Sequence, residues 1–173
     1  NLLSITRINN EKIKIEKTSV ILDELIDSVM TKFLNRHPEQ KVTIDIPNEI
    51  VVVSVDPILI EQVLMNLLEN AVFHAENMTH IILRVFASER KVIFEIADDG
   101  CGIREDMLKD IFGGTYGTQN NSADGKKRNA GIGLSVCATI IKAHDGEISA
   151  ENRKDGGALF RFTLGKEDSA YDE

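Results

Sequence analysis

Apolar residues follow two patterns along the chain, and each pattern predicts one kind of element. Helical spacing of apolar positions predicts helices over 19–33 and 57–75. The second helix has a defined start, because the Asp56 carboxylate can accept a backbone N–H and Pro57 suits the first helical position. A further helix, opened by glycines, is predicted over 130–144, and short helical segments over 1–8 and 104–111.

Alternating or continuous apolar runs predict strands between these helices. The predicted strands cover 12–20, 41–46, 51–55, 80–88, 91–97, 146–152 and 158–165. Asp155, Gly156 and Gly157 are turn residues between the last two strands, which predicts a closing hairpin. Strands and helices do not alternate as regular βαβ units, so the order favours an α+β sandwich in which helices cover one face of a sheet.

The composition is that of one globular domain. The chain has 173 residues, of which 42% are hydrophobic and 28% charged, enough for a single core. Its net charge of -8 argues against a nucleic-acid-binding surface. The one compact basic cluster in the sequence, Lys126, Lys127 and Arg128, is too small for a duplex but sufficient for one polyphosphate.

Cysteine usage and the chain ends bear on the compartment. Cys101 and Cys137 have no metal-ligand spacing and give no disulfide framework, which fits a reducing compartment. No apolar run reaches transmembrane length, and no signal peptide is visible. The sequence begins in mid-pattern at Asn1, so we expect a fragment of a longer protein whose membrane or sensory parts lie outside it.

Two asparagines, Asn66 and Asn70, stand one turn apart inside the second predicted helix, in the stretch NLLENAVFHA. Asn is unfavourable within helices, because its amide competes for backbone hydrogen bonds. A pair of solvated polar residues is one explanation. The other is a ligand face, because Mg²⁺ prefers oxygen ligands, takes few of them from the protein and binds beside polyphosphates.

The stretch ADDGCGI ends a predicted strand with a carboxylate and two glycines, Asp98, Gly100 and Gly102. A simple turn is one interpretation, since Asp-Gly is a common turn pair. The alternative is a nucleotide site, because glycine lets a ligand approach the backbone closely. An ionised carboxylate only accepts hydrogen bonds. It would therefore select adenine, which presents a donor at N6, over guanine, which presents an acceptor there.

A second glycine pair, Gly131 and Gly133, opens the helix predicted over 130–144. It can be a flexible lead-in, or a phosphate site in which the N–H groups of a helix N-terminus bind oxygens. The nearby basic cluster, 126–128, could pair with the same phosphates. The pattern is not a P-loop, since Asn120 and Lys127 stand where that motif has Gly and Ser or Thr.

The order of these features resembles the GHKL superfamily, the ATP-binding domain shared by sensor histidine kinases, DNA gyrase, a class of heat-shock chaperones and mismatch-repair ATPases. NLLENA resembles its N box, DDGCG its first glycine box, IF at 111–112 the F box of histidine kinases, and AGIGLSV its second glycine box. NLLSITRI, at 1–8, resembles the last turns of the helical hairpin that precedes the ATP-binding domain in histidine kinases. Two stretches, VDPILIEQVLMNLLENAV and ENRKDGGALFRFTLG, are most similar to the potassium-responsive Kdp sensor kinases.

This resemblance implies a Bergerat-type two-layer sandwich with a mixed sheet and a long ATP lid over 113–130. It implies that Asn70 ligates Mg²⁺ with support from Asn66, and that Asp98 binds the adenine amino group. The implied nucleotide-binding set is Asn66, Asn70, Asp98, Gly100, Gly102, Ile103, Phe112, Lys126, Lys127, Arg128, Gly131, Gly133 and Leu134. No residue is assigned as catalytic.

The resemblance also implies a domain plan and a function. Residues 1–10 would be the stub of the hairpin, 11–165 the catalytic and ATP-binding domain, and 166–173 an acidic tail. The domain would bind Mg-ATP and phosphorylate a histidine on that hairpin, in the cytoplasmic part of a bacterial membrane-bound sensor. Its partners would be ATP, the hairpin and a response regulator, with no nucleic acid.

Two alternatives remain open at this point. The family often has Lys where Phe73 stands, and a glycine where Asn129 stands, which leaves room for a nucleotide-sensing pseudokinase module. A GHKL-type ATPase would need a water-activating acid where Asn66 stands. Of the four histidines, only His144 is followed by an acid, at the end of a predicted helix, so we expect the phosphoacceptor to lie outside this chain.

Overall fold

The computed structural model describes residues 13–113 and 125–166, and for 125–132 it describes the backbone alone. The described strands are β1 (Thr18–Ile21), β2 (Lys41–Asp45), β3 (Val52–Val55), β4 (His80–Ala87), β5 (Lys91–Asp98), β6 (Ile148–Asn152) and β7 (Ala158–Gly165). The described helices are α2 (Leu22–Arg36), α3 (Pro57–His74), α4 (Glu105–Leu108) and α5 (Gly125–Ala143).

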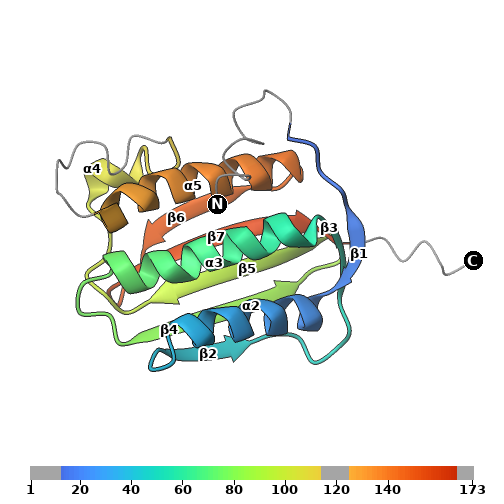
Figure 1. Cartoon of the computed structure of the whole chain (residues 1–173), viewed down its shortest axis with the longest axis horizontal. Helices are drawn as coiled ribbons and strands as arrows, with labels where there is room; N and C mark the ends of the chain where they lie inside the picture. The colour runs from blue at the N-terminus through green and yellow to red at the C-terminus, as the bar shows by residue number, and fades with distance from the viewer. Residues whose placement is uncertain (1–12, 114–124, 167–173) are drawn as a thin grey trace, which may run out of the picture.

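The molecule has two layers, as the sequence predicts. Helices α2, α3 and α5 lie side by side over one face of a sheet with strand order β2-β4-β5-β7-β6 (Figure 1). The sheet is mixed, because β2 pairs in parallel with β4 and the other neighbours are antiparallel. Strands β1 and β3 form a separate antiparallel pair. The predicted α+β sandwich with one covered face is therefore confirmed.

The core lies between the helices and the sheet. Val29 and Phe33 of α2 and Leu67 of α3 are fully buried there. From the sheet, Phe94 and Phe162 stack with ring centroids 4.6 Å apart. Alternation along β4, β5 and β7 sends every second side chain into this layer, which is the period that a half-buried strand requires.

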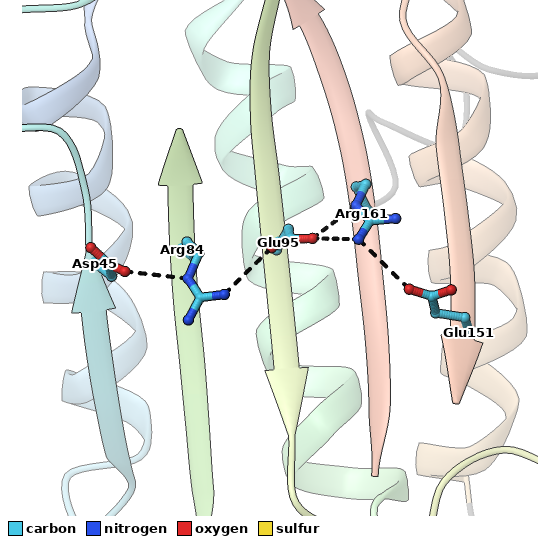
Figure 2. A network of polar contacts seen from close by, with 5 residues as sticks. All are labelled: Asp45, Arg84, Glu95, Glu151 and Arg161. Atoms are coloured by element: carbon cyan, nitrogen blue, oxygen red, sulfur yellow. Dashed lines mark hydrogen bonds and ion pairs between the residues drawn. The ribbon is translucent and has the colours of Figure 1, made fainter. Parts of the chain in front are cut away.

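A row of alternating charges crosses the opposite face of the sheet, one residue from each strand (Figure 2). The order is Asp45, Arg84, Glu95, Arg161 and Glu151. The shortest contact joins Arg161 Nη2 to Glu95 Oε2, at 2.6 Å. We call these five residues the charge row. Each residue of the row contacts an opposite charge on the neighbouring strand. Such opposite-charge pairs stabilise the pairing of strands.

Several element boundaries differ from the predictions. Of the predicted strand 12–20, only 18–20 is a strand among the described residues; β1 extends one residue further, to Ile21, and α2 starts at Leu22. The β-branched residues of 18–21 pair with β3 instead of joining the helix. The helix predicted over 104–111 is a single turn, α4. The predicted start of α3, with the Asp56 side chain accepting from Leu59 N, is confirmed.

Helix α5 begins at Gly125, five residues before the predicted start. Only the first four N–H groups of a helix lack an intrahelical partner. Gly131 and Gly133 therefore lie inside the helix, and the amides of its N-terminus belong to 125–128 instead. The hairpin stub, most of the lid over 113–130 and nearly all of the acidic tail lie outside the described residues. Within the described ranges, no helix combines the length and apolar character needed to cross a bilayer.

Candidate nucleotide-binding site

A pocket opens where the C-terminal turns of α3 meet the loop after β5 and the start of β7. Its polar lining comes from Asn70, His74 and Asp98. Its apolar lining includes Ile103, Ile111 and Phe160. A concave pocket lined by apolar side chains and a few convergent polar groups is the usual form of a small-molecule site. The predicted residues Asn70, Asp98, Gly102 and Ile103 thus meet at one place, although they come from separate elements.

Asp98 is the buried acid of this pocket, with 3% of the residue exposed. Its Oδ1 accepts hydrogen bonds from Gly100 N at 2.9 Å and from Ala158 N at 3.3 Å. Its Oδ2 makes no hydrogen bond with any described residue. Burial raises the pKa of the carboxyl above its usual 3.8, and the two amide donors oppose that shift. One oxygen is therefore held by the protein, and the other is available to a ligand.

The neighbouring acid, Asp99, has a different role. Its Oδ1 accepts from the backbone N–H groups of Thr79 and His80, and the Thr79 hydroxyl donates to its Oδ2. These donors, led by that hydroxyl, lower the Asp99 pKa to about 2. Asp99 ties the loop after β5 to the start of β4. Of these two adjacent acids, Asp99 therefore has a structural role and Asp98 lines the pocket.

The two asparagines of α3 are also unequal. Asn66 directs Nδ2 toward α5, 3.5 Å from Gly133 O and 3.7 Å from Cys137 Sγ. Asn70 lines the pocket, and its Oδ1 is buried without a hydrogen-bond partner among the described residues. A buried carbonyl oxygen without a donor loses free energy unless a ligand satisfies it. Asn70 therefore fits the metal role that the resemblance implies, whereas Asn66 contacts α5 and its support of the metal site stays a prediction.

The glycines of the loop after β5 are required by close approach. A Cβ at Gly100 would lie 2.7 Å from the Ala75 Cβ, nearer than real contacts allow. Gly102 has a φ of +81°, a conformation that side chains disfavour, and a Cβ there would lie 2.8 Å from Asn152 Oδ1. The loop therefore packs against the end of α3 on one side and against the β6–β7 turn on the other.

Other predicted residues lie behind the pocket or outside the described side chains. Phe112 packs edge-on against Phe160, with ring centroids 6.3 Å apart. Leu134 is buried in the core, with 1% exposed. The basic cluster 126–128 falls in the first turns of α5, but its side chains lie outside those described. The roles of that cluster and of Gly131 in phosphate binding stay predictions.

Sequence reasoning missed some residues of the site. His74 lines the pocket four positions after Asn70, so helical spacing could have found it. Asn152 and Arg153 contact the loop after β5 through hydrogen bonds from a distant turn. Both residues lie in the stretch ENRKDGGALFRFTLG that resembles the Kdp sensor kinases, but nothing in that stretch by itself indicates a contact with the loop after β5.

Comparison with known proteins identifies the family. The family model described as histidine kinase-, DNA gyrase B-, and HSP90-like ATPase matches residues 55–168, which include the whole pocket. The chain belongs to this ATPase family. That membership confirms the resemblance drawn from the motifs, and it supports ATP as the nucleotide.

Solved members of the ATPase family share the fold. The catalytic domain of the histidine kinase ThkA is 31% identical, with a TM-score of 0.73, over 87% of this chain and 98% of that one. A full-length ShkA structure in complex with AMPPNP has a TM-score of 0.78 and covers 95% of this chain, but at 22% identity it shows the fold alone.

Curated relatives in the ATPase family are sensor kinases of greater length. The sensor protein KdpD of Clostridium acetobutylicum is 35% identical over 96% of this chain and 18% of its own length. The adaptive-response sensory kinase SasA of a Nostoc species is 41% identical over 83% of this chain and 34% of its own length. The chain spans about a fifth to a third of these relatives.

Proposed function

We propose that this chain is the ATP-binding and catalytic part of a sensor histidine kinase, and that the pocket beside Asp98 holds the adenine of Mg-ATP. The observation that carries the proposal is the pair of oxygens at the pocket. The Asp98 carboxylate makes its hydrogen bonds with described residues through Oδ1, and Asn70 Oδ1 is buried without a partner among those residues. A site with two acceptor oxygens and apolar walls suits a purine that donates to one oxygen, with a cation bound at the other.

The Asp98 carboxylate supports selection of adenine. Because Gly100 N and Ala158 N hold Oδ1, the orientation of the carboxylate is set before a ligand arrives. Oδ2 would accept from adenine N6, whereas guanine would place an acceptor against it. The aliphatic and aromatic side chains of Ile103, Ile111 and Phe160 would contact the ring.

Asn70 is the described residue that fits a Mg²⁺ ligand. Its amide oxygen is neutral, and Mg²⁺ commonly combines few protein oxygens with phosphate oxygens and water. When bound, the ion would neutralise phosphate charge during phosphoryl transfer. The contribution of this chain is then to bind and orient the nucleotide.

The competing functions are less well supported. An ATPase of the gyrase type needs an acid at Asn66, whose amide instead faces α5. Glu69 is no substitute, since its Oε1 lies 2.7 Å from Arg36 Nη1 on the side of α2. Phe73 supports the pseudokinase interpretation, but its ring packs against His37, 5.7 Å between centroids, and it does not line the pocket.

The phosphoacceptor is proposed to be a histidine on a helical hairpin outside this chain. His144 is buried, and both ring nitrogens are engaged by backbone groups. His80 is hydrogen-bonded to the Thr43 hydroxyl. The solved complex of ThkA with the response regulator protein TrrA supports a response regulator as the next partner. We place the domain on the cytoplasmic side of a larger bacterial sensor, where ATP is available.

The test combines binding and transfer. Calorimetry with Mg²⁺ should show binding of ATP and much weaker binding of GTP. With labelled ATP the chain alone should stay unlabelled, and addition of the separate hairpin should give acid-labile label on the hairpin. Stoichiometric acid-labile label on the chain alone would overturn the assignment of the acceptor. ATP binding without transfer to the hairpin would favour the pseudokinase function.

A further inference from the structure

The turn between β6 and β7 holds the loop 98–103 at both of its ends. Asn152 is the last residue of β6, and Arg153 follows it. Asn152 contacts Ile103, at the far end of the loop, and Arg153 contacts Asp98, at its start. Both contacts join residues about fifty positions apart in the chain.

Asn152 pairs with the backbone of Ile103 as a neighbouring strand would. Its Oδ1 accepts from Ile103 N and its Nδ2 donates to Ile103 O, each at 2.7 Å. This double contact requires the amide to lie close to Gly102, where a Cβ would be 2.8 Å from Oδ1. Glycine at 102 therefore makes room for the side chain of Asn152 as well as for a positive φ.

Arg153 combines a hydrogen bond with a favourable charge. Its Nη1 donates to the backbone carbonyl of Asp98 at 2.7 Å, and its own N–H donates to Gly157 O at 2.8 Å. Gly157, with a φ of +90°, lets the turn approach so closely that a Cβ would collide with Asp98 O. The guanidinium is thus fixed beside the acid that lines the pocket.

We propose that Asn152 and Arg153 are positioning residues of the adenine site, which hold the backbone of Ile103 and of Asp98 in place. The proposal rests on the proposed nucleotide function of the pocket. It assigns part of nucleotide recognition to the β6–β7 turn. Neither residue needs to touch the nucleotide.

Two charged side chains, those of Asp99 and Arg153, act on the Asp98 carboxyl among the described residues. Burial has the largest effect and raises its pKa; Asp99 raises it further, whereas Arg153 lowers it. His74 lines the same pocket. A protonated Asp98 carries an O–H donor, which would face the donor at adenine N6. Nucleotide binding should therefore weaken as pH falls toward the pKa of Asp98. Arg153 should move that loss to lower pH.

The first experiment measures ATP affinity against pH for the parent chain, Arg153→Gln and Lys154→Gln. Lys154 is the exposed neighbour in the same turn and provides a charge-matched control. Arg153→Gln should bind ATP about tenfold more weakly near neutral pH, the effect of a lost hydrogen bond from a charged group. Its affinity should also begin to fall at a higher pH than in the other two proteins. ATP itself also titrates in this range, but this affects all three proteins equally and does not change the comparison.

The second experiment uses hydrogen exchange, which needs no nucleotide. Asn152→Ala removes both bonds to Ile103, whereas Asn152→Asp keeps an acceptor for Ile103 N–H and loses the donor. The Ile103 amide should exchange faster in Asn152→Ala than in Asn152→Asp or the parent, without faster exchange in the core of β5. Both variants should bind ATP more weakly, with the larger loss in Asn152→Ala.

The outcomes separate this inference from the function on which it rests. If the parent chain binds no ATP, the proposed function falls and this inference falls with it. If the parent binds ATP and Arg153→Gln has the same pH profile as Lys154→Gln, the role of Arg153 is overturned. Unchanged ATP affinity in Asn152→Ala overturns the role of Asn152. A global loss of stability in Asn152→Ala would leave Asn152→Asp as the deciding variant.

Discussion

The backbone N–H of Asp56 donates a hydrogen bond to Nε2 of His144 at 3.1 Å, although 88 residues separate them. The other ring nitrogen, Nδ1, lies 2.8 Å from the carbonyl oxygen of Ile140. A neutral imidazole with its proton on Nδ1 satisfies both contacts. His144 thus joins the start of α3 to the end of α5.

We expect His144 to make the fold sensitive to acid. Burial lowers its pKa below the usual 6.5, because the charged imidazolium loses its contact with water. A proton on Nε2 would also remove the hydrogen bond from the Asp56 N–H. The unfolded chain therefore binds this proton first, so stability is complete above about pH 6.5 and falls as pH drops toward the folded pKa. The slope is at most about 1.4 kcal/mol per pH unit for one proton.

Urea unfolding at about pH 7 and about pH 5 tests this expectation. His144→Gln removes the titration, so its loss of stability between the two pH values should be smaller than that of the parent. The other histidines are present in both proteins and cancel. An equal loss in both would contradict the assignment to His144.

Asp98→Asn should separate nucleotide binding from folding. The amide oxygen can still accept from Gly100 N and Ala158 N, but its NH₂ would face adenine N6, which is also a donor. ATP binding should weaken by about 1–3 kcal/mol. Because the folded pKa of Asp98 is raised, the ionised acid costs stability at neutral pH, and the variant should unfold at an equal or higher temperature.

Calorimetry of ATP binding and a thermal melt of the same sample check both parts. Unchanged ATP affinity in Asp98→Asn would show that the acid does not contact the base. A lower melting temperature would show that the amide is not accommodated in this orientation.

Asn70→Ala should remove the magnesium-dependent part of ATP binding and leave adenosine binding nearly intact. Its Oδ1 has no partner among the described residues, so the substitution breaks no described hydrogen bond at that atom. Alanine is also the better helix former, by up to about 0.7 kcal/mol. The thermal midpoint should therefore not fall. Calorimetry with ATP and with adenosine, each with and without Mg²⁺, makes the measurement, and equal loss of both ligands would point to a folding defect.

Glu95→Ala should destabilise the protein without changing the pocket. The Glu95 side chain is 10% exposed and lies between Arg84 and Arg161 in the charge row (Figure 2). Its removal leaves two like charges on the two strands that flank β5. Both arginines are at least 39% exposed, so water offsets part of the loss and we expect about 1–3 kcal/mol.

Glu151→Ala is the matched control for the charge row. Glu151 ends the row, is 57% exposed and lies 3.6 Å from Arg161, so its removal should cost less than about 1 kcal/mol. Urea is the appropriate denaturant, because guanidinium chloride would screen the charges. Equal effects of the two substitutions would contradict a central role for Glu95.

Local patterns in the sequence determined most of the elements and the identity of the site. Asp56 and Pro57 mark the start of α3 because capping involves residues only a few positions apart. Alternating apolar residues, with Gly156 and Gly157 between them, predict the hairpin of β6 and β7 for the same reason. Asn70, Asp98 and Gly102 were found because each lies in a short motif whose composition is unusual for its element.

The tertiary structure decided which of several similar groups meets the ligand. Asp98 and Asp99 are adjacent in the sequence, but only the fold brings Ala158 to Asp98 and Thr79 to Asp99. The bonds from Asn152 and Arg153 to the loop 98–103 likewise depend on β7 lying between β5 and β6. A pattern read along the chain reports neighbours within a few residues, whereas hydrogen-bond partners at the pocket are chosen by the order of strands in the sheet.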